Sequence, residues 1–181
     1  TIEQTIEMYR QMGTPEEKLA QVTEQMQIAI ALFKIMIPSV LMLTAVVDTF
    51  LNFFIAKVVL RKLGQDVEDF PPFKNWTVPD YSVYFFALSL VMMYWGDSRD
   101  ITMIYNSGVN ICALSVVALF IQGVSLFYYL GDKYNLSRIV RGIILLLIMS
   151  NVFLMLLLVY FGAADAIIDY RRLRKSPKIE S

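Results

Sequence analysis

Residues 139–161 read IVRGIILLLIMSNVFLMLLLVYF, and this stretch decides the class of fold. Arg141 is its only charged residue. An α-helix needs about 20 mostly apolar residues to cross a hydrocarbon core about 30 Å thick, so the stretch predicts a transmembrane helix. The composition agrees, because 57% of the chain is hydrophobic and only 18% is charged. In soluble domains about half of the residues are apolar and about a quarter are charged.

Three further apolar segments lie upstream, and together the four predict an all-α, polytopic membrane helical bundle with about four transmembrane helices. They cover about 35–60, 79–95 and 101–130. The segment 79–95 has the shortest apolar core and fits either a span or a re-entrant segment. Trp76 and Trp95 bracket it at about 28 Å if all helical, which is typical of interfacial anchors.

A polar arm precedes these segments. Its apolar residues recur at helical spacing, and Thr14 followed by Pro15 and Glu17 is a typical helix start. Such an arm fits a surface helical hairpin or a partner-docking element. We therefore predict an amphipathic helical arm over 1–33, a transmembrane region over 34–163 and a basic cytoplasmic tail over 164–181.

The basic residues suggest an orientation for the chain. Four crossings would place the tail on the side of the arm, opposite Lys74, Lys133 and Arg141. The positive-inside rule then gives a modest preference for a cytoplasmic tail.

Several classes of function are disfavoured by composition. The formal net charge is zero, which argues against a nucleic-acid partner. There is no histidine, and the single Cys112 cannot form an intrachain disulfide. No nucleophile–base pair, metal cluster or phosphate loop is visible, so we expect neither an enzyme nor a cofactor.

Polar residues within the spans are the candidate site. Thr44, Asp48 and Asn52 are spaced by four and share one helix face. Asn106 and Asn110 share a face of the third span, and Gln122 follows on a second stripe. Polar groups at bilayer depth need a partner or a purpose, so all six either contact a solute or join helices by hydrogen bonds. A solute site predicts that Asp48, Asn52 and Asn110 meet at one cavity of about 300 Å³ or more.

The start of the tail holds charges at helical spacing. Asp165, Asp169, Arg171 and Arg172 fit either a docking surface for a cytoplasmic partner or a helix end with local ion pairs.

Several motifs in order resemble a known family. They are EQTIEMYRQMG at 3–13, AKVVLRKLG at 56–64, PPFKNWTVP at 71–79 and GAADAIIDYRRL at 162–173. This order resembles the YybS-like family of bacterial multi-pass membrane proteins. The resemblance implies a location in the bacterial plasma membrane and makes this chain similar to the carboxy-terminal part of longer proteins.

That family is grouped with the S components of energy-coupling factor transporters. The resemblance therefore implies a subunit that binds a small solute and docks on membrane and ATPase subunits. The Ala-x-x-x-Ala docking face frequent in S components does not occur here. The alternative is a non-transport membrane scaffold linked to envelope or sporulation machinery.

Overall fold

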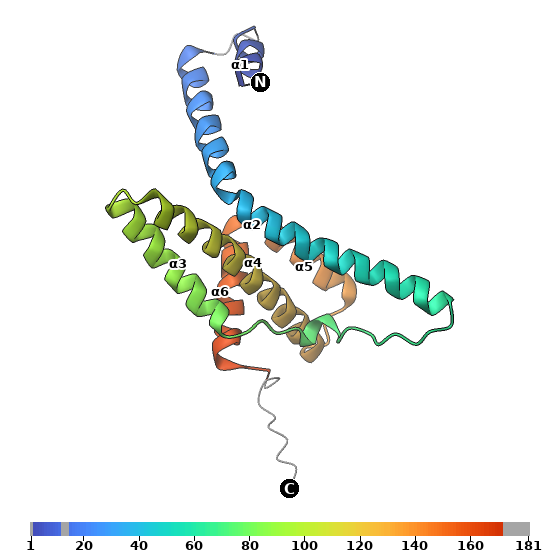
Figure 1. Cartoon of the computed structure of the whole chain (residues 1–181). Coiled ribbons are helices and arrows are strands. Elements are labelled where there is room, and N and C mark those ends of the chain that lie inside the picture. The colour runs from blue at the N-terminus through green and yellow to red at the C-terminus, as the bar shows by residue number, and fades with distance from the viewer. Residues whose placement is uncertain (1, 12–14, 172–181) are drawn as a thin grey trace.

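A computed structural model describes residues 2–11 and 15–171, and this part of the chain contains helices and no strand (Figure 1). The all-α class is confirmed. The elements are α1 (Ile2–Gln11), α2 (Glu16–Lys62), the 3-10 turn η1 (Phe73–Asn75), α3 (Tyr81–Ser98), α4 (Thr102–Lys133), α5 (Arg138–Met149) and α6 (Val152–Ile168).

The centre of the fold is α4, which contacts α2, η1, α3 and α6. Its Leu119 is fully buried with Val159 and Ala166 of α6. Gly123 and Gly162 lie where α4 crosses α6, and a Cβ on either glycine would meet backbone atoms of the other helix. The two backbones are therefore in contact, as small residues allow in membrane helices.

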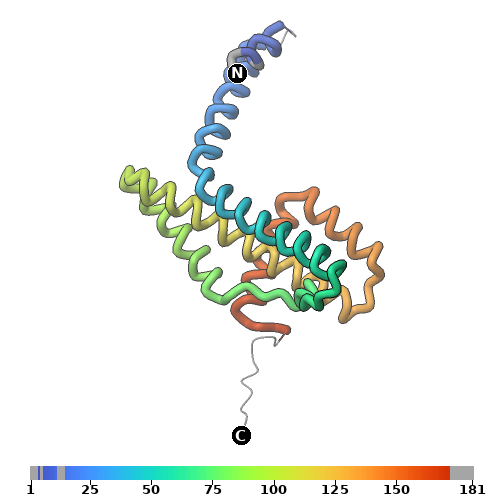
Figure 2. Tube along the Cα trace, turned by 45° about the vertical axis from the view of Figure 1, so that its right-hand side comes forward, coloured from blue at the N-terminus to red at the C-terminus, as the bar shows by residue number. Residues whose placement is uncertain are grey.

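The part of the arm from Glu16 onward and the first span form one helix, while α1 is a separate helix. α2 runs without interruption through the expected boundary at 33/34, and Pro38 lies inside it. Proline cannot donate the hydrogen bond that the Lys34 carbonyl would otherwise receive, and such positions bend helices. Figures 1 and 2 show a bend where α2 turns from blue to cyan.

A side chain from α4 supports this bend. The Asn110 amide donates to the Ile35 carbonyl at 2.8 Å and accepts from the Ser39 backbone N–H at 3.0 Å. Ile35 and Ser39 are the two ends of one i-to-i−4 step of α2. Asn110 thus supplies hydrogen bonds where the helical ladder is weakest, which explains why the proline does not end the helix.

The predicted span 139–161 is not one straight helix. It breaks between α5 and α6, which meet at 110°. The Asn151 side chain accepts from the Phe153 and Leu154 amides at 2.9 and 3.3 Å and so begins a new helix. The pair is therefore a broken span or a re-entrant hairpin.

The expected number of four spans is not confirmed. In the described part of the chain, α2 and α4 are long and apolar enough to cross a membrane, with a third crossing if the α5–α6 pair counts as one. The segment predicted at 79–95 is helical as α3 but is not among them. Its 18 residues include Asp97, which lowers the hydropathy of this short helix.

The prediction that the tail lies at the opposite end of the bundle from Lys74 and Lys133 is wrong. Arg171 donates to the Lys74 carbonyl at 2.6 Å, and Lys133 donates to the Tyr170 hydroxyl at 2.8 Å. The bend between α5 and α6 returns the chain to the end from which α5 starts. Figure 1 shows α6 descending to the same end as η1.

Candidate functional site

An aromatic cluster joins α2 to the loop before α3. Phe50 of α2 lies 5.6 Å from both Phe70 and Trp76, measured between ring centroids. The Trp76 indole donates to the Pro71 carbonyl at 2.9 Å. The loop is therefore packed against the helix by ring contacts, which add to the energy of apolar burial.

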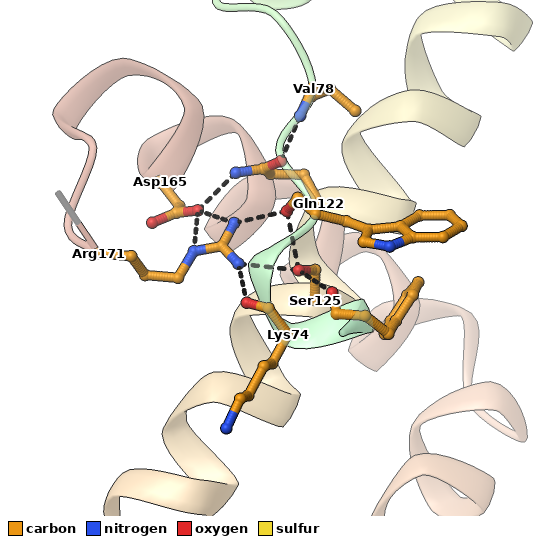
Figure 3. A network of polar contacts seen from close by, with 8 residues as sticks. Lys74, Val78, Gln122, Ser125, Asp165 and Arg171 are labelled. Atoms are coloured by element: carbon orange, nitrogen blue, oxygen red, sulfur yellow. Dashed lines mark hydrogen bonds and ion pairs between the residues drawn. The ribbon is translucent and has the colours of Figure 1, made fainter. Parts of the chain in front are cut away.

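Behind this cluster lies a buried polar network (Figure 3). Gln122 of α4 accepts from the Val78 amide at 2.7 Å and donates to the Asp165 carboxylate of α6 at 2.5 Å. The side chains of Asp165 and Arg171 are 2% and 1% exposed and form an ion pair at 2.8 Å. Breaking a buried pair by removing one partner is strongly destabilising, so the network fixes these elements together.

Arg171 uses all of its hydrogen-bond donors. Nε and Nη2 donate to Asp165, Nη1 donates to the Lys74 carbonyl and the Ser125 hydroxyl, and Nη2 also donates to the Trp76 carbonyl. These are the five N–H groups that a guanidinium has. One Asp165 oxygen, Oδ1, is buried without a hydrogen-bond partner among the described residues.

A cavity of about 320 Å³ opens beside the network. Its walls come from α2, the loop before α3, and α4. Its lining residues are Phe50, Phe70, Pro71, Asn75, Trp76, Thr77, Val78, Ile121 and Gln122. None of these is charged, and the polar side-chain groups are two amides, one hydroxyl and the Trp76 indole N–H, which donates to the Pro71 carbonyl. This composition resembles a small-ligand pocket, which is mostly apolar with a few polar groups.

The first polar stripe does not reach this cavity. Thr44, Asp48 and Asn52 are exposed on α2, and the Thr44 hydroxyl bonds to Val40 of its own helix. Asn110 bonds to α2 at Ser39, nine residues before Asp48 or about 13 Å along the helix. The structure therefore does not bring Asp48, Asn52 and Asn110 together.

The predicted residues on α4 differ in their surroundings. Asn106 and Asn110 are half-buried, and Asn110 donates to the Asn106 carbonyl at 2.8 Å. Gln122 is the one predicted residue that lines the cavity. The described part of the chain has no group of three or more His, Cys, Asp or Glu residues that could hold a metal.

The residues expected at the tail are mostly not on the surface. Asp165 and Arg171 are buried, and Asp169 is half-buried with a left-handed backbone, φ 50°, at the end of α6. Arg172 lies outside the described residues. Local ion pairing therefore describes Asp165 and Arg171 better than an accessible docking surface does.

Sequence reasoning missed the cavity itself. Phe50 carries no motif, and Asn75 and Thr77 lie in the PPFKNWTVP motif without a pattern that marks them as lining residues. The available signal is the PPF motif with Trp76, whose distance from Trp95 is also typical of a membrane-interface anchor. Ser125 lay on the stripe with Gln122, and its partners Phe73 and Trp76 are 52 and 49 residues away along the chain.

These features define a helical multi-pass membrane protein with a polar network that joins its helices to the loop between α2 and α3. The chain belongs to the family described as predicted membrane protein (DUF2232), which matches residues 1–166. It is also 30% identical over 135 residues to the Uncharacterized protein YybS of Bacillus subtilis (strain 168). The YybS-like resemblance is thereby confirmed.

The aligned region covers 74% of this chain and 42% of that Bacillus protein, so the match spans less than half of the relative. No solved structure matches the chain.

Proposed function

We propose that this protein is a plasma-membrane subunit that binds a small solute in the cavity beside Trp76, in the manner of an S component. The observation that carries the proposal is the 320 Å³ cavity with its aromatic wall and the Gln122 amide. The volume lies at the lower end of the range for small-molecule sites, which favours a small ligand.

The lining favours an uncharged and mainly apolar solute. No ionisable side chain lines the cavity, and burying a charge without a partner is costly. The Gln122 Nε2 has two N–H groups, of which one is used by Asp165, so the other is a donor for a ligand acceptor. A ring with one hydrogen-bond acceptor matches these groups. We propose a binding role and not an enzymatic one.

The charge distribution supports a cytoplasmic position for the loop end. The basic residues at this end are Lys57, Arg61, Lys62, Lys74, Lys133, Arg138, Arg141 and Arg171. The opposite end and the arm carry Arg10, Lys18, Lys34 and Arg99. The positive-inside rule therefore favours a cytoplasmic position for the cavity mouth and Arg171, and we propose that membrane and ATPase subunits of a transporter would dock at this end.

The polar contacts between helices favour a scaffold as the second candidate. Asn110 and Gln122 each join two or more elements through side-chain hydrogen bonds, and these bonds need no solute. In this case the protein would hold other envelope or sporulation components in the membrane.

Native mass spectrometry of the purified protein separates the two. Thr77→Phe fills the cavity from the loop, and Thr49→Phe is a matched control because Thr49 is exposed on α2 outside the lining. A co-purifying small molecule lost only in Thr77→Phe would support the cavity. Loss in Asp48→Ala or Asn52→Ala, with retention in Thr77→Phe, would move the site to the α2 stripe. No bound molecule in any variant favours the scaffold.

A further inference from the structure

The loop from Phe73 to Val78 forms one wall of the cavity and has little regular secondary structure. Beyond the short η1 turn, its polar groups are held by side chains from other elements. Gln122 accepts from the Val78 amide, and Ser125 Oγ lies 2.7 and 2.9 Å from the Phe73 and Trp76 carbonyl oxygens. A hydroxyl has one hydrogen and cannot bond both carbonyls fully.

Arg171 supplies the hydrogen-bond donors that the loop carbonyl groups still need. Its guanidinium donates to the Trp76 carbonyl at 3.0 Å and to the Lys74 carbonyl at 2.6 Å. Figure 3 shows the guanidinium between Asp165 on one side and the loop carbonyl groups on the other. Because Asp165 fixes the guanidinium through Nε and Nη2, the loop is tied to the end of α6.

We propose that Arg171 is a positioning residue for the cavity, so that the position of the C-terminal segment sets the shape of the wall that carries Trp76. The proposal rests on the proposed function for its ligand consequence. A movement of the chain after α6 would withdraw the guanidinium from Lys74 and Trp76. It would also disturb Gln122, which shares the Asp165 carboxylate and lines the cavity.

The planar guanidinium of Arg171 allows its positioning of the loop to be distinguished from simple neutralisation of the Asp165 charge. A lysine at 171 would keep the charge beside Asp165 but has three donors on one nitrogen and cannot reach the same set of acceptors. Arg171→Lys should therefore keep the ion pair and lose the hold on the loop. Arg171→Gln paired with Asp165→Asn removes the hold without leaving a single buried charge.

Trp76 fluorescence tests the positioning without any ligand. In a Trp95→Phe background, Trp76 is the only tryptophan. Arg171→Lys and the neutral double variant should shift its emission to the red and increase its quenching by acrylamide, with helical circular dichroism retained. Lys133→Gln is the control, because it removes the exposed contact with Tyr170 and leaves the guanidinium in place. Emission in both Arg171 variants equal to that of the control overturns the proposal.

The ligand consequence is read by native mass spectrometry on the same variants. The solute lost in Thr77→Phe should also be lost or reduced in Arg171→Lys. If Arg171→Lys keeps the solute at full occupancy although Trp76 is displaced, the link between Arg171 and ligand binding is overturned. If no variant or parent carries a solute, the failure falls on the proposed function, and Trp76 emission alone decides whether Arg171 positions the loop.

Discussion

The α4–α6 crossing gives a prediction that can be worked out from the structure: Gly162→Ala should destabilise the fold. A Cβ on Gly162 would lie 2.7 Å from the Gly123 backbone nitrogen and closer still to the Leu119 carbonyl oxygen. Ordinary contact begins at 3.4 Å, so the helices must separate by at least about 0.7 Å. Both neighbouring groups are backbone and cannot rotate away.

The expected cost has two parts. Overpacking a close contact costs about 1–3 kcal/mol. Separation also stretches the bond between Gln122 and Asp165, because Gln122 adjoins Gly123 on α4 and Asp165 lies about one turn after Gly162 on α6. A weakened hydrogen bond to a buried charge adds about 1–3 kcal/mol. We expect a total loss of about 2–6 kcal/mol in the free energy of unfolding.

Reversible unfolding in mixed detergent–SDS micelles, followed by circular dichroism, measures this change. Gly142→Ala is the matched control, since a Cβ there meets nothing within 4 Å on α5. It should be neutral or stabilise by up to about 1 kcal/mol. A Gly162→Ala protein whose stability lies within about 0.5 kcal/mol of the parent would refute the close crossing.

Three further predictions concern α2 and the orientation. Asn110→Leu should lower the free energy of unfolding by about 1–2 kcal/mol in the same assay, because it removes the bonds to α2, whereas Asn52→Leu should change little; equal effects would contradict the bridging role. Asp48→Leu should raise stability, since the exposed carboxylate has no partner among the described residues and a carboxylate at bilayer depth costs about 2.5–3.5 kcal/mol; a loss would reveal a partner. In a cysteine-free background, Gln65→Cys should react with a membrane-impermeant maleimide only when the cytoplasmic face is open, and Ser98→Cys only from the other face; the reverse pattern would invert the orientation.

The helices of this fold could be predicted from the sequence with fair accuracy, but their ends and breaks could not. The apolar runs before Arg61 and after Ile101 do form α2 and α4. The joining of the arm to α2 was hidden because Pro38 is tolerated through Asn110, a contact between residues more than 70 positions apart. The break at Asn151 had a local signal, since asparagine favours helix N-caps, although the surrounding apolar run obscured it.

The site was only partly predictable for a similar reason. Gln122 could be found because a polar residue inside an apolar run is unusual. Asp165 and Arg171 could be found as an ion pair, but nothing local shows that they are buried. Their burial depends on the loop from Phe73 to Val78 folding over them, and the sequence carries no pattern for that contact.

The length of α2 has a mechanical consequence. Its 47 residues follow a path about 70 Å long with a bend near Pro38, and this path is longer than the 40–45 Å of a bilayer with its headgroups. The bend and the Asn110 contact lie near its midpoint and divide α2 into two arms of about 35 Å each. A change of about 10° in the direction of one arm moves the end of that arm by about 6 Å. The arm that begins at Glu16 is thus joined, at the Asn110 contact, to the arm that carries Phe50 of the cavity wall.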